Sequence, residues 1–188
     1  MKYTSCFVGI PLPTRFESEF LAVATEAKRL FPNLRLADTT TPHITVYYLD
    51  EQAQEHIDEI AGIVDRQTAL LRGTALHVSD IGIFDPEEPR VVYLAVDPGD
   101  NLKKFQENIA RELHSYNAID NFLGFTPHIT IGKISTAERE DFEKYRAALE
   151  KLLQGVDWLF DIEEVSIYGV DSRIQPEKQE KLRHIVVS

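Results

Sequence analysis

The pentapeptide Thr-Pro-His-Ile-Thr occurs twice in this 188-residue chain, at residues 41–45 and again at residues 126–130. The two copies begin 85 residues apart, and an apolar residue follows each of them, Val46 in the first and Ile131 in the second. An internal duplication is the simplest explanation of an identity of this length. The repeat therefore predicts a fold with two similar halves, each containing one copy.

Each copy is expected to form a strand with one polar face. Successive side chains of a strand point to opposite faces, so His43 and Thr45 share one face and Ile44 lies on the other. In the second copy, His128 and Thr130 share a face in the same way. While the isoleucines pack into a core, each strand then presents an imidazole and a hydroxyl roughly 6–7 Å apart.

These side chains form a set that is suited to phosphodiester chemistry. A neutral imidazole can accept a proton from an attacking water or hydroxyl, and an imidazolium can donate a proton to a leaving oxygen, both near neutral pH. Two hydroxyls beside them can donate hydrogen bonds to the non-bridging oxygens of a phosphoryl group. The alternative for each copy is an ordinary core strand whose histidine and threonine satisfy local hydrogen bonds.

The rest of the chain alternates between predicted helices and strands. Helical spacing of apolar residues predicts helices over residues 15–31, 51–71, 101–116 and 136–153. Strand patterns cover residues 7–13, 42–49, 74–84 with a break near Gly82, 90–96, 127–134, 163–170 and 183–188, and the last two are expected to pair. This order predicts an α+β protein whose two halves are built on antiparallel-rich sheets.

Composition and charge exclude several classes of protein. The formal net charge of −11 argues against binding to a long nucleic acid, which needs many Lys and Arg side chains. No apolar run approaches the roughly 18–20 residues of a membrane span, and the N-terminus lacks the features of a secretory signal. We therefore expect a cytoplasmic protein, monomeric and without a membrane partner. Neither a GxGxxG nor a P-loop pattern is present, so the sequence does not predict the usual dinucleotide-binding or NTP-binding site.

Several stretches of the chain resemble one enzyme family. The motifs "HITV" and "HITI", the opening "CFVGIPLP", the segment "IGIFDPEEPRVVYLAV" and the stretch "GFTPHITIGKI" are similar to the 2H phosphoesterase superfamily. Its members include the RNA 2′,3′-cyclic phosphodiesterases, also called 2′-5′ RNA ligases. The resemblance covers most of the chain and is looser after Thr136.

The resemblance implies a single bilobal domain over residues 1–188, with pseudo-twofold symmetry and no metal or other cofactor. Both His-x-Thr pairs would lie in a groove between the lobes, with His43, Thr45, His128 and Thr130 as the catalytic residues. One histidine would activate water and the other would protonate the leaving ribose oxygen, in an order that the sequence does not give. The implied reaction is hydrolysis of 2′,3′-cyclic phosphate or 2′-5′ phosphodiester bonds of RNA ends or nucleotides, with reversible ligation.

Three aromatic residues are expected to help bind the substrate. Tyr47 is in phase with His43 and Thr45 if strict alternation continues, so it would line the groove and stack on a base. Phe84 and Phe125 are further base-stacking residues. For each of them, packing against a neighbouring element is the alternative.

Three cationic residues are expected near the phosphate. Lys133 follows the second motif, where strict alternation places it on the face opposite Thr130 unless a bulge rotates the strand. Arg90 lies at the mouth of the predicted hairpin, and Arg173 follows a late strand. The alternative for all three is a solvated position.

The sequence is compatible with other functions as well. The same site could instead degrade cyclic oligonucleotides or 2′-5′ oligoadenylates that act as immune signals, as phage and viral members of the superfamily do. A non-catalytic nucleotide-binding module and a metal-dependent hydrolase are further alternatives. Neither motif supplies a second strong metal ligand, because threonine binds zinc poorly. For each of the enzymatic functions, the expected substrate is a small nucleotide, a cyclic oligonucleotide or an RNA terminus.

Overall fold

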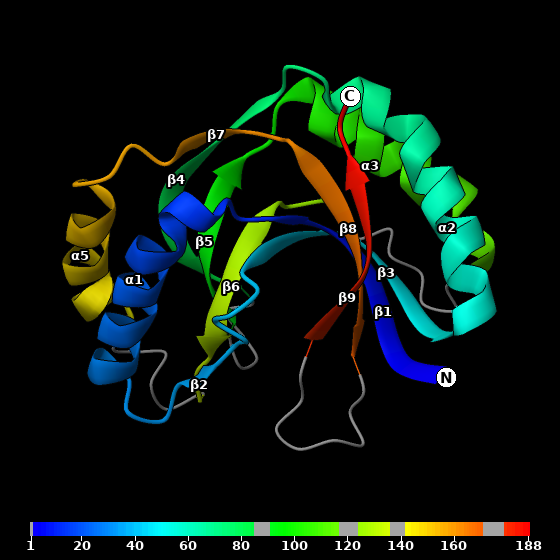
Figure 1. Cartoon of the computed structure of the whole chain (residues 1–188). Coiled ribbons are helices and arrows are strands. Elements are labelled where there is room, and N and C mark those ends of the chain that lie inside the picture. Colours follow the sequence, from blue (N-terminus) through cyan, green and yellow to red (C-terminus); the bar gives the residue numbers. More distant parts are fainter. Residues whose placement is uncertain (1, 85–90, 117–123, 136–141, 171–178) are drawn as a thin grey trace.

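The computed structural model describes residues 2–84, 91–116, 124–135, 142–170 and 179–188. Its strands form one curled, antiparallel sheet of nine strands (Figure 1), which run in the order β7-β4-β5-β6-β3-β1-β8-β9, with the short β2 paired to β6. The strands are β1 (Lys2–Pro11), β2 (Arg35–Leu36), β3 (His43–Ala53), β4 (Ala75–Ile83), β5 (Val91–Asp97), β6 (His128–Lys133), β7 (Leu159–Asp161), β8 (Glu164–Val170) and β9 (Gln179–Val186).

The helices lie outside the curl of the sheet. They are α1 (Glu17–Leu30), α2 (Gln54–Gln67), α3 (Asp100–Glu112) and α5 (Phe142–Leu153), with short 3-10 turns η1 (Thr14–Phe16), η2 (Thr68–Leu71) and η3 (His114–Tyr116). None of these helices, among the residues that the structure describes, is long and apolar enough to cross a membrane.

The sheet consists of two halves that meet between β3 and β6. The two strands share a single pair of opposed residues, Ile44 and Ile129, and both isoleucines are buried. Outward from this join, β1 and β8 flank β3 just as β5 and β4 flank β6. The predicted α+β architecture with two similar antiparallel halves is therefore confirmed, and the two predicted sheets are continuous through the isoleucine pair.

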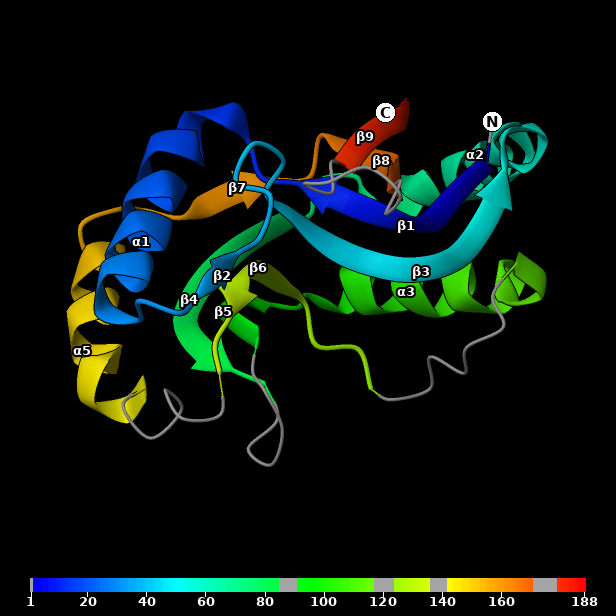
Figure 2. The same ribbon diagram turned by 90° about the horizontal axis from the view of Figure 1, so that it is seen from below.

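The helices are exchanged between the halves. Although α1 follows β1, it packs against α5 and β6, and α3, which follows β5, packs against α2 and β3. Figure 1 shows α1 and α5 together at one side of the sheet and α2 and α3 together at the other, and Figure 2 shows the same grouping from below. Each half of the sheet is thus covered by one helix from its own repeat and one from the other.

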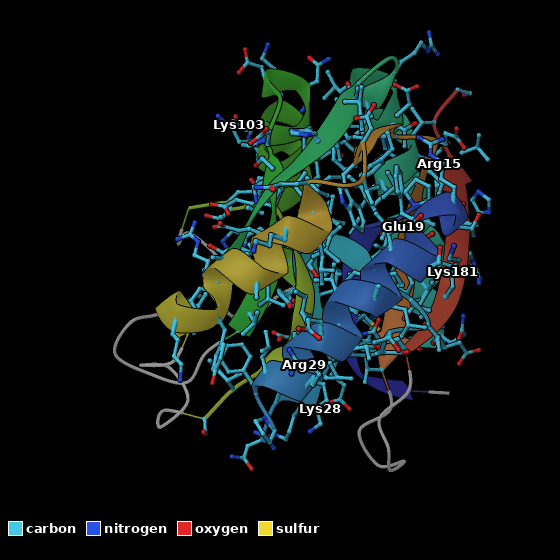
Figure 3. All side chains as sticks on the ribbon, turned by 90° about the vertical axis from the view of Figure 1, so that its left-hand side faces the viewer. Arg15, Glu19, Lys28, Arg29, Lys103 and Lys181 are labelled. Atoms are coloured by element: carbon cyan, nitrogen blue, oxygen red, sulfur yellow. The ribbon has the colours of Figure 1, made fainter. Side chains whose placement is uncertain are left out.

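Amphipathic sequence explains where the first helix forms and ends. In α1, Phe20, Val23 and Ala27 recur at helical spacing and are buried against the sheet. In its last turn, Lys28 donates hydrogen bonds to the carbonyl oxygens of Pro32 and Leu34, both at 2.8 Å. This lysine lies at the lower end of α1 in Figure 3 and ties the segment that follows the helix back to its last turn.

Several predicted boundaries differ from the structure. Strand β3 continues to Ala53 because its pairing with β1 extends that far, so α2 begins three residues later than expected. Strand β4 is continuous through Gly82, and its irregularity lies between Val78 and Asp80. The three-residue strand β7 was not predicted, because it is too short to show a pattern. Residues 136–141 of the fourth predicted helix lie outside the described residues.

Candidate active site

The pairing of Ile44 with Ile129 brings the two motifs together. In an antiparallel pair the residue before one partner lies across from the residue after the other. This register places His43 across from Thr130 and Thr45 across from His128. Each histidine is therefore matched with the threonine of the other motif on the concave face of the sheet.

Both histidines are held by the same hydrogen bond. The Nδ1 atom of His43 lies 2.8 Å from the carbonyl oxygen of Thr41, and the Nδ1 atom of His128 lies 2.8 Å from the carbonyl oxygen of Thr126. A carbonyl oxygen can only accept, so Nδ1 carries a hydrogen in both rings. In the neutral tautomer, Nε2 is then the atom free to accept a proton.

Two aromatic rings fix the plane of the His43 imidazole. Its centroid lies 4.5 Å from that of Phe7 and 5.2 Å from that of Tyr168, and both contacts are stacked. Gly9 makes this approach possible, because a Cβ there would lie 3.2 Å from the Tyr168 ring and 3.4 Å from His43 Cδ2. The sequence "FVG" of β1 thus shapes the surroundings of His43.

The second imidazole has a corresponding pair of neighbours. His128 makes edge contacts with Phe84 and Tyr93 at centroid distances of 4.7 and 5.5 Å, and these two rings stack on each other at 4.0 Å. Gly82 leaves room for the Tyr93 ring, because a Cβ at Gly82 would lie only 2.7 Å from the Tyr93 hydroxyl. Each half of the site therefore uses a glycine to admit an aromatic ring beside its histidine.

Burial lowers the pKa of both histidines. For His43, the positive charge that His128 can carry lowers the pKa further, whereas the bond to Thr41 and the carboxylate of Asp38 act in the opposite direction. For His128, desolvation outweighs the bond to Thr126. Both rings are therefore biased toward the neutral form, the form that a general base requires.

A β-bulge overturns the predicted position of Tyr47. Opposite β1, Thr45 pairs with Gly9 and Tyr47 pairs with Val8, so Val46 is an extra residue. Val46 and Tyr47 consequently both lie on the core side, and Tyr47 is only 6% exposed. The bulge brings Tyr48 onto the face of His43, where it is 50% exposed and its ring contacts Phe7 at 6.1 Å.

The second motif contains the same bulge. Opposite β5, Thr130 pairs with Tyr93 and Gly132 pairs with Val92, which leaves Ile131 as the extra residue. Lys133 is thereby returned to the face of Thr130, contrary to strict alternation, and it is exposed. Lys133 and Tyr48 occupy equivalent positions in the two repeats.

A pocket of about 340 Å³ adjoins the site on the side of His128. Phe84 and Phe125, both predicted to bind substrate, line it together with Thr45 and His128. The other lining residues are Val46, Tyr47, Tyr48, Gln106, Gly124 and Thr126. Tyr47 thus lines the pocket although it is almost fully buried. The two predicted arginines, Arg90 and Arg173, lie outside the described residues.

Sequence reasoning missed four aromatic residues of the site: Phe7, Tyr48, Tyr93 and Tyr168. Phe7 lies two residues before Gly9 on a predicted strand, a spacing that places both on one face. That signal was available, but nothing in the sequence showed which face of β1 turns toward His43. Tyr48 required the bulge, and Tyr93 and Tyr168 required the strand order.

No three His, Cys, Asp or Glu side chains gather in a way that suits a metal ion within the described ranges. The buried Cys6 lies in the core of β1, where desolvation raises the pKa of its thiol to about 11. This thiol remains protonated near neutral pH and is a poor nucleophile.

Several known proteins are similar to this chain in sequence or in fold. An RNA 2′,3′-cyclic phosphodiesterase of Thermotoga maritima is 31% identical over 117 residues, which span 62% of this chain and 58% of that protein. The fold is similar to E. coli LigT in complex with 3′-AMP, with a TM-score of 0.72, 18% identity and 99% of each chain covered. It is also similar to a protein of Thermus thermophilus, with a TM-score of 0.73, 13% identity and 97% of each chain covered.

The match to a family model spans most of the chain. The model of the 2′-5′ RNA ligase superfamily matches residues 16–173, a range that includes both His-x-Thr motifs and every strand from β2 to β8. The family predicted from the sequence is therefore confirmed: the chain belongs to the 2′-5′ RNA ligase superfamily.

Proposed function

We propose that this protein is a metal-independent phosphodiesterase that hydrolyses 2′,3′-cyclic phosphates of nucleotides or RNA ends. The observation that carries the proposal is the crossed arrangement of His43 with Thr130 and of His128 with Thr45, with both Nδ1 atoms bound to carbonyl oxygens. A phosphoryl group between the motifs would meet two imidazole Nε2 atoms and two hydroxyls.

The proposed hydrolysis needs only these groups. The oxygen of a water molecule bonds to phosphorus while the bond from phosphorus to the 3′ oxygen of the ribose breaks, which leaves a 2′-phosphate. One neutral imidazole takes the proton of the water, and the other, as imidazolium, gives a proton to the leaving oxygen. Thr45 and Thr130 donate hydrogen bonds to the non-bridging oxygens, where negative charge grows. Exchange with solvent then restores both histidines.

The related proteins support a nucleotide substrate. The relative from Thermotoga maritima is named for action on RNA 2′,3′-cyclic phosphate, and E. coli LigT has been solved with 3′-AMP, with ATP and with phosphate. The net charge of −11 favours small nucleotides or RNA termini over long RNA. We further propose that the protein acts as a monomer in the cytoplasm.

The test is hydrolysis of the four 2′,3′-cyclic mononucleotides in the presence of EDTA, with the His43→Ala/His128→Ala protein as control. Turnover by the wild type alone is the expected result. Activity that disappears in EDTA and returns with zinc or manganese would replace this proposal with a metal-dependent mechanism. Tight nucleotide binding without turnover would identify a binding module.

A further inference from the structure

The segment that leads to His43 has no apolar side chain to hold it in place. Residues 38–41 read Asp-Thr-Thr-Thr, and none of them is buried. The carbonyl oxygen of Thr41 nevertheless binds Nδ1 of His43 at 2.8 Å, so the position of the imidazole depends on the position of this segment. Because apolar packing cannot fix these residues, hydrogen bonds and charge have to fix them.

The carboxylate of Asp38 is the centre of these polar interactions. Its Oδ1 atom accepts hydrogen bonds from the backbone N–H and from the hydroxyl of Thr40, at 2.9 and 2.6 Å. The backbone N–H of Gln179 and the hydroxyl of Thr41 bind the same carboxylate. The Thr41 hydroxyl also lies 3.0 Å from Oε1 of Gln179. Asp38 therefore holds the turn within the segment and ties it to the beginning of β9.

The second repeat supports its imidazole in a different way. The carbonyl oxygen that binds His128 Nδ1 follows Phe125, a residue that packs against the hydrophobic core. Phe125 corresponds to Thr40, and the residue that corresponds to Asp38 in the sequence is Leu123. The repeats thus share the bond from each imidazole to a carbonyl oxygen, at 2.8 Å in both, but only the first repeat has a carboxylate at this position.

We infer that Asp38 is a positioning residue for His43, because its carboxylate holds the Thr41 carbonyl oxygen against Nδ1 of the imidazole. As a role in catalysis, this inference rests on the proposed function. The bond to Thr41 keeps a hydrogen on Nδ1, which leaves Nε2 for proton transfer. If the segment were loosened, the ring could turn or change its tautomer, and small displacements of a catalytic group are costly.

The charge of Asp38 has a second effect on the same ring. Partial burial raises the pKa of the Asp38 carboxyl, but the hydrogen bonds that it accepts, those from Thr40 first, outweigh burial and lower the pKa below its ordinary value. The group is therefore ionised wherever the histidines titrate. A carboxylate near an imidazole favours the protonated ring, so Asp38 opposes the effect of burial on His43.

Strands β6, β8 and β1 bring the other neighbours of this imidazole. On β6, His128 acts against protonation of the ring through the positive charge that it can carry itself. On β8, Tyr168 stacks on the ring, and burial raises the pKa of its phenol to about 12, so it is uncharged. On β1, Phe7 stacks on the ring and does not titrate. Within the described residues, Asp38 is thus the carboxylate whose charge acts on this imidazole.

The test separates the charge of Asp38 from its hydrogen bonds. Asp38→Asn removes the charge and keeps an oxygen that can accept both bonds from Thr40, whereas Asp38→Ala removes the charge and the bonds together. Asp157→Asn is the matched control, because it removes the same charge at an exposed position between α5 and β7. NMR spectroscopy follows the titration and the tautomer of each histidine in the wild type and in the three variants, without any substrate.

The two histidines should respond differently. In Asp38→Asn the midpoint of the His43 titration should fall, because a stabilising charge is lost, while that of His128 should not fall. In Asp38→Ala, His43 should also lose its preference for the Nδ1–H tautomer, and His128 should keep it. Asp157→Asn should leave both rings as they are in the wild type. A wild-type His43 tautomer in Asp38→Ala would refute the inference, and so would equal changes in the two histidines.

Kinetics then relates the position of His43 to turnover. On a 2′,3′-cyclic mononucleotide, Asp38→Ala should lower kcat about tenfold, and Asp38→Asn should recover much of the loss. KM should change less than kcat, because the role of Asp38 is to place a catalytic group and not to bind the substrate. An unchanged kcat in Asp38→Ala would refute the role in catalysis.

The two proposals fail in different ways. A wild type that is inactive on all four cyclic mononucleotides would refute the proposed function. The NMR titration would still decide whether Asp38 positions His43, because it needs no turnover.

Discussion

Ile44 and Ile129 form the single opposed pair through which β3 and β6 join the two halves of the sheet. Because the pair is antiparallel, it also sets the histidine of each motif across from the threonine of the other motif. The side chains that hold the fold together at this point and the side chains that face the groove are thus successive residues of the same two strands.

Because the isoleucine pair joins the two halves of the sheet, truncating one of its side chains should destabilise the fold. Ile129→Ala should lower the free energy of unfolding by about 2–5 kcal/mol, because it leaves a cavity at a fully buried position. Urea denaturation followed by circular dichroism measures the change. Leu36→Ala is the control, since Leu36 is 41% exposed, and it should change the free energy much less. Comparable losses in the two variants would contradict the proposed role of the join.

Removing either imidazole should abolish most of the activity while the fold remains. His43→Ala and His128→Ala are each expected to lower kcat on a 2′,3′-cyclic mononucleotide by about 10²–10⁴-fold, the usual contribution of a general acid or base. Steady-state kinetics gives the loss, and circular dichroism checks the fold. Near-normal rates in both variants would refute the assignment.

The threonines should matter less than the histidines. Thr45→Ala and Thr130→Ala each remove one hydrogen bond to a charged phosphoryl group, worth about 1.5–3 kcal/mol, or roughly 10–150-fold in kcat/KM. Thr45→Ser and Thr130→Ser retain the hydroxyl and should recover much of the activity. Serine variants as poor as the alanine variants would show that the hydroxyl is not the functional group.

The glycines beside the site should affect catalysis through the rings that they admit. Gly9→Ala would place a Cβ 3.2 Å from the Tyr168 ring and 3.4 Å from His43, so the imidazole must shift. We expect kcat to fall about tenfold, since small misplacements of catalytic groups are costly. Gly62→Ala is the control, because the space around its Cβ is open except for one Arg66 atom at 3.9 Å. An unchanged kcat in Gly9→Ala would show that the ring packing does not position His43.

The lowered pKa values of the histidines predict a pH dependence of stability. In the folded protein, burial disfavours the charged rings, whereas in the unfolded chain they titrate near the ordinary value of about 6.5. The unfolded state therefore binds more protons as the pH falls through this range, and the free energy of unfolding should decrease from pH 7.5 to pH 5.

The control for the pH dependence is the protein without the two rings. In His43→Asn/His128→Asn the decrease between pH 7.5 and pH 5 should be smaller than in the wild type, as measured by urea denaturation at each pH. The optimum of kcat/KM should also lie below pH 6.5, because the active form holds one ring neutral and the other protonated. An equally steep decrease in the double variant would assign the effect to other groups.

The repeated motif allowed most of the fold and the centre of the site to be predicted from sequence. His43, Thr45, His128 and Thr130 share the concave face as expected, because a period of two holds over the first residues of each strand. The expected phase was wrong at Tyr47, where a bulge shifts the alternation by one residue, although Tyr47 still lines the pocket beside His128. A bulge depends on how the neighbouring strand pairs, and a local pattern of apolar residues does not contain that information.

The aromatic residues that contact the histidines could not be predicted from the sequence, for a related reason. Tyr168 lies 125 residues after His43 in the chain, and only the order of β1, β3 and β8 in the sheet brings the two rings within 5.2 Å. Of the corresponding glycines, Gly82 was expected to mark a break in its strand, and Gly9 was expected to lie within a continuous one. In the structure they are sites of close approach between a strand and a neighbouring ring.

The exchange of α1 and α3 between the halves also bears on how the chain folds and on its origin. Neither repeat can cover its own half of the sheet, since a helix of the other repeat completes each apolar core. A fragment containing one repeat would expose that core, so the two halves gain stability together, in one cooperative transition. Two identical short chains that exchanged one helix would form the same arrangement, which is that of a domain-swapped dimer. Joining two such copies end to end would give a single chain with this fold.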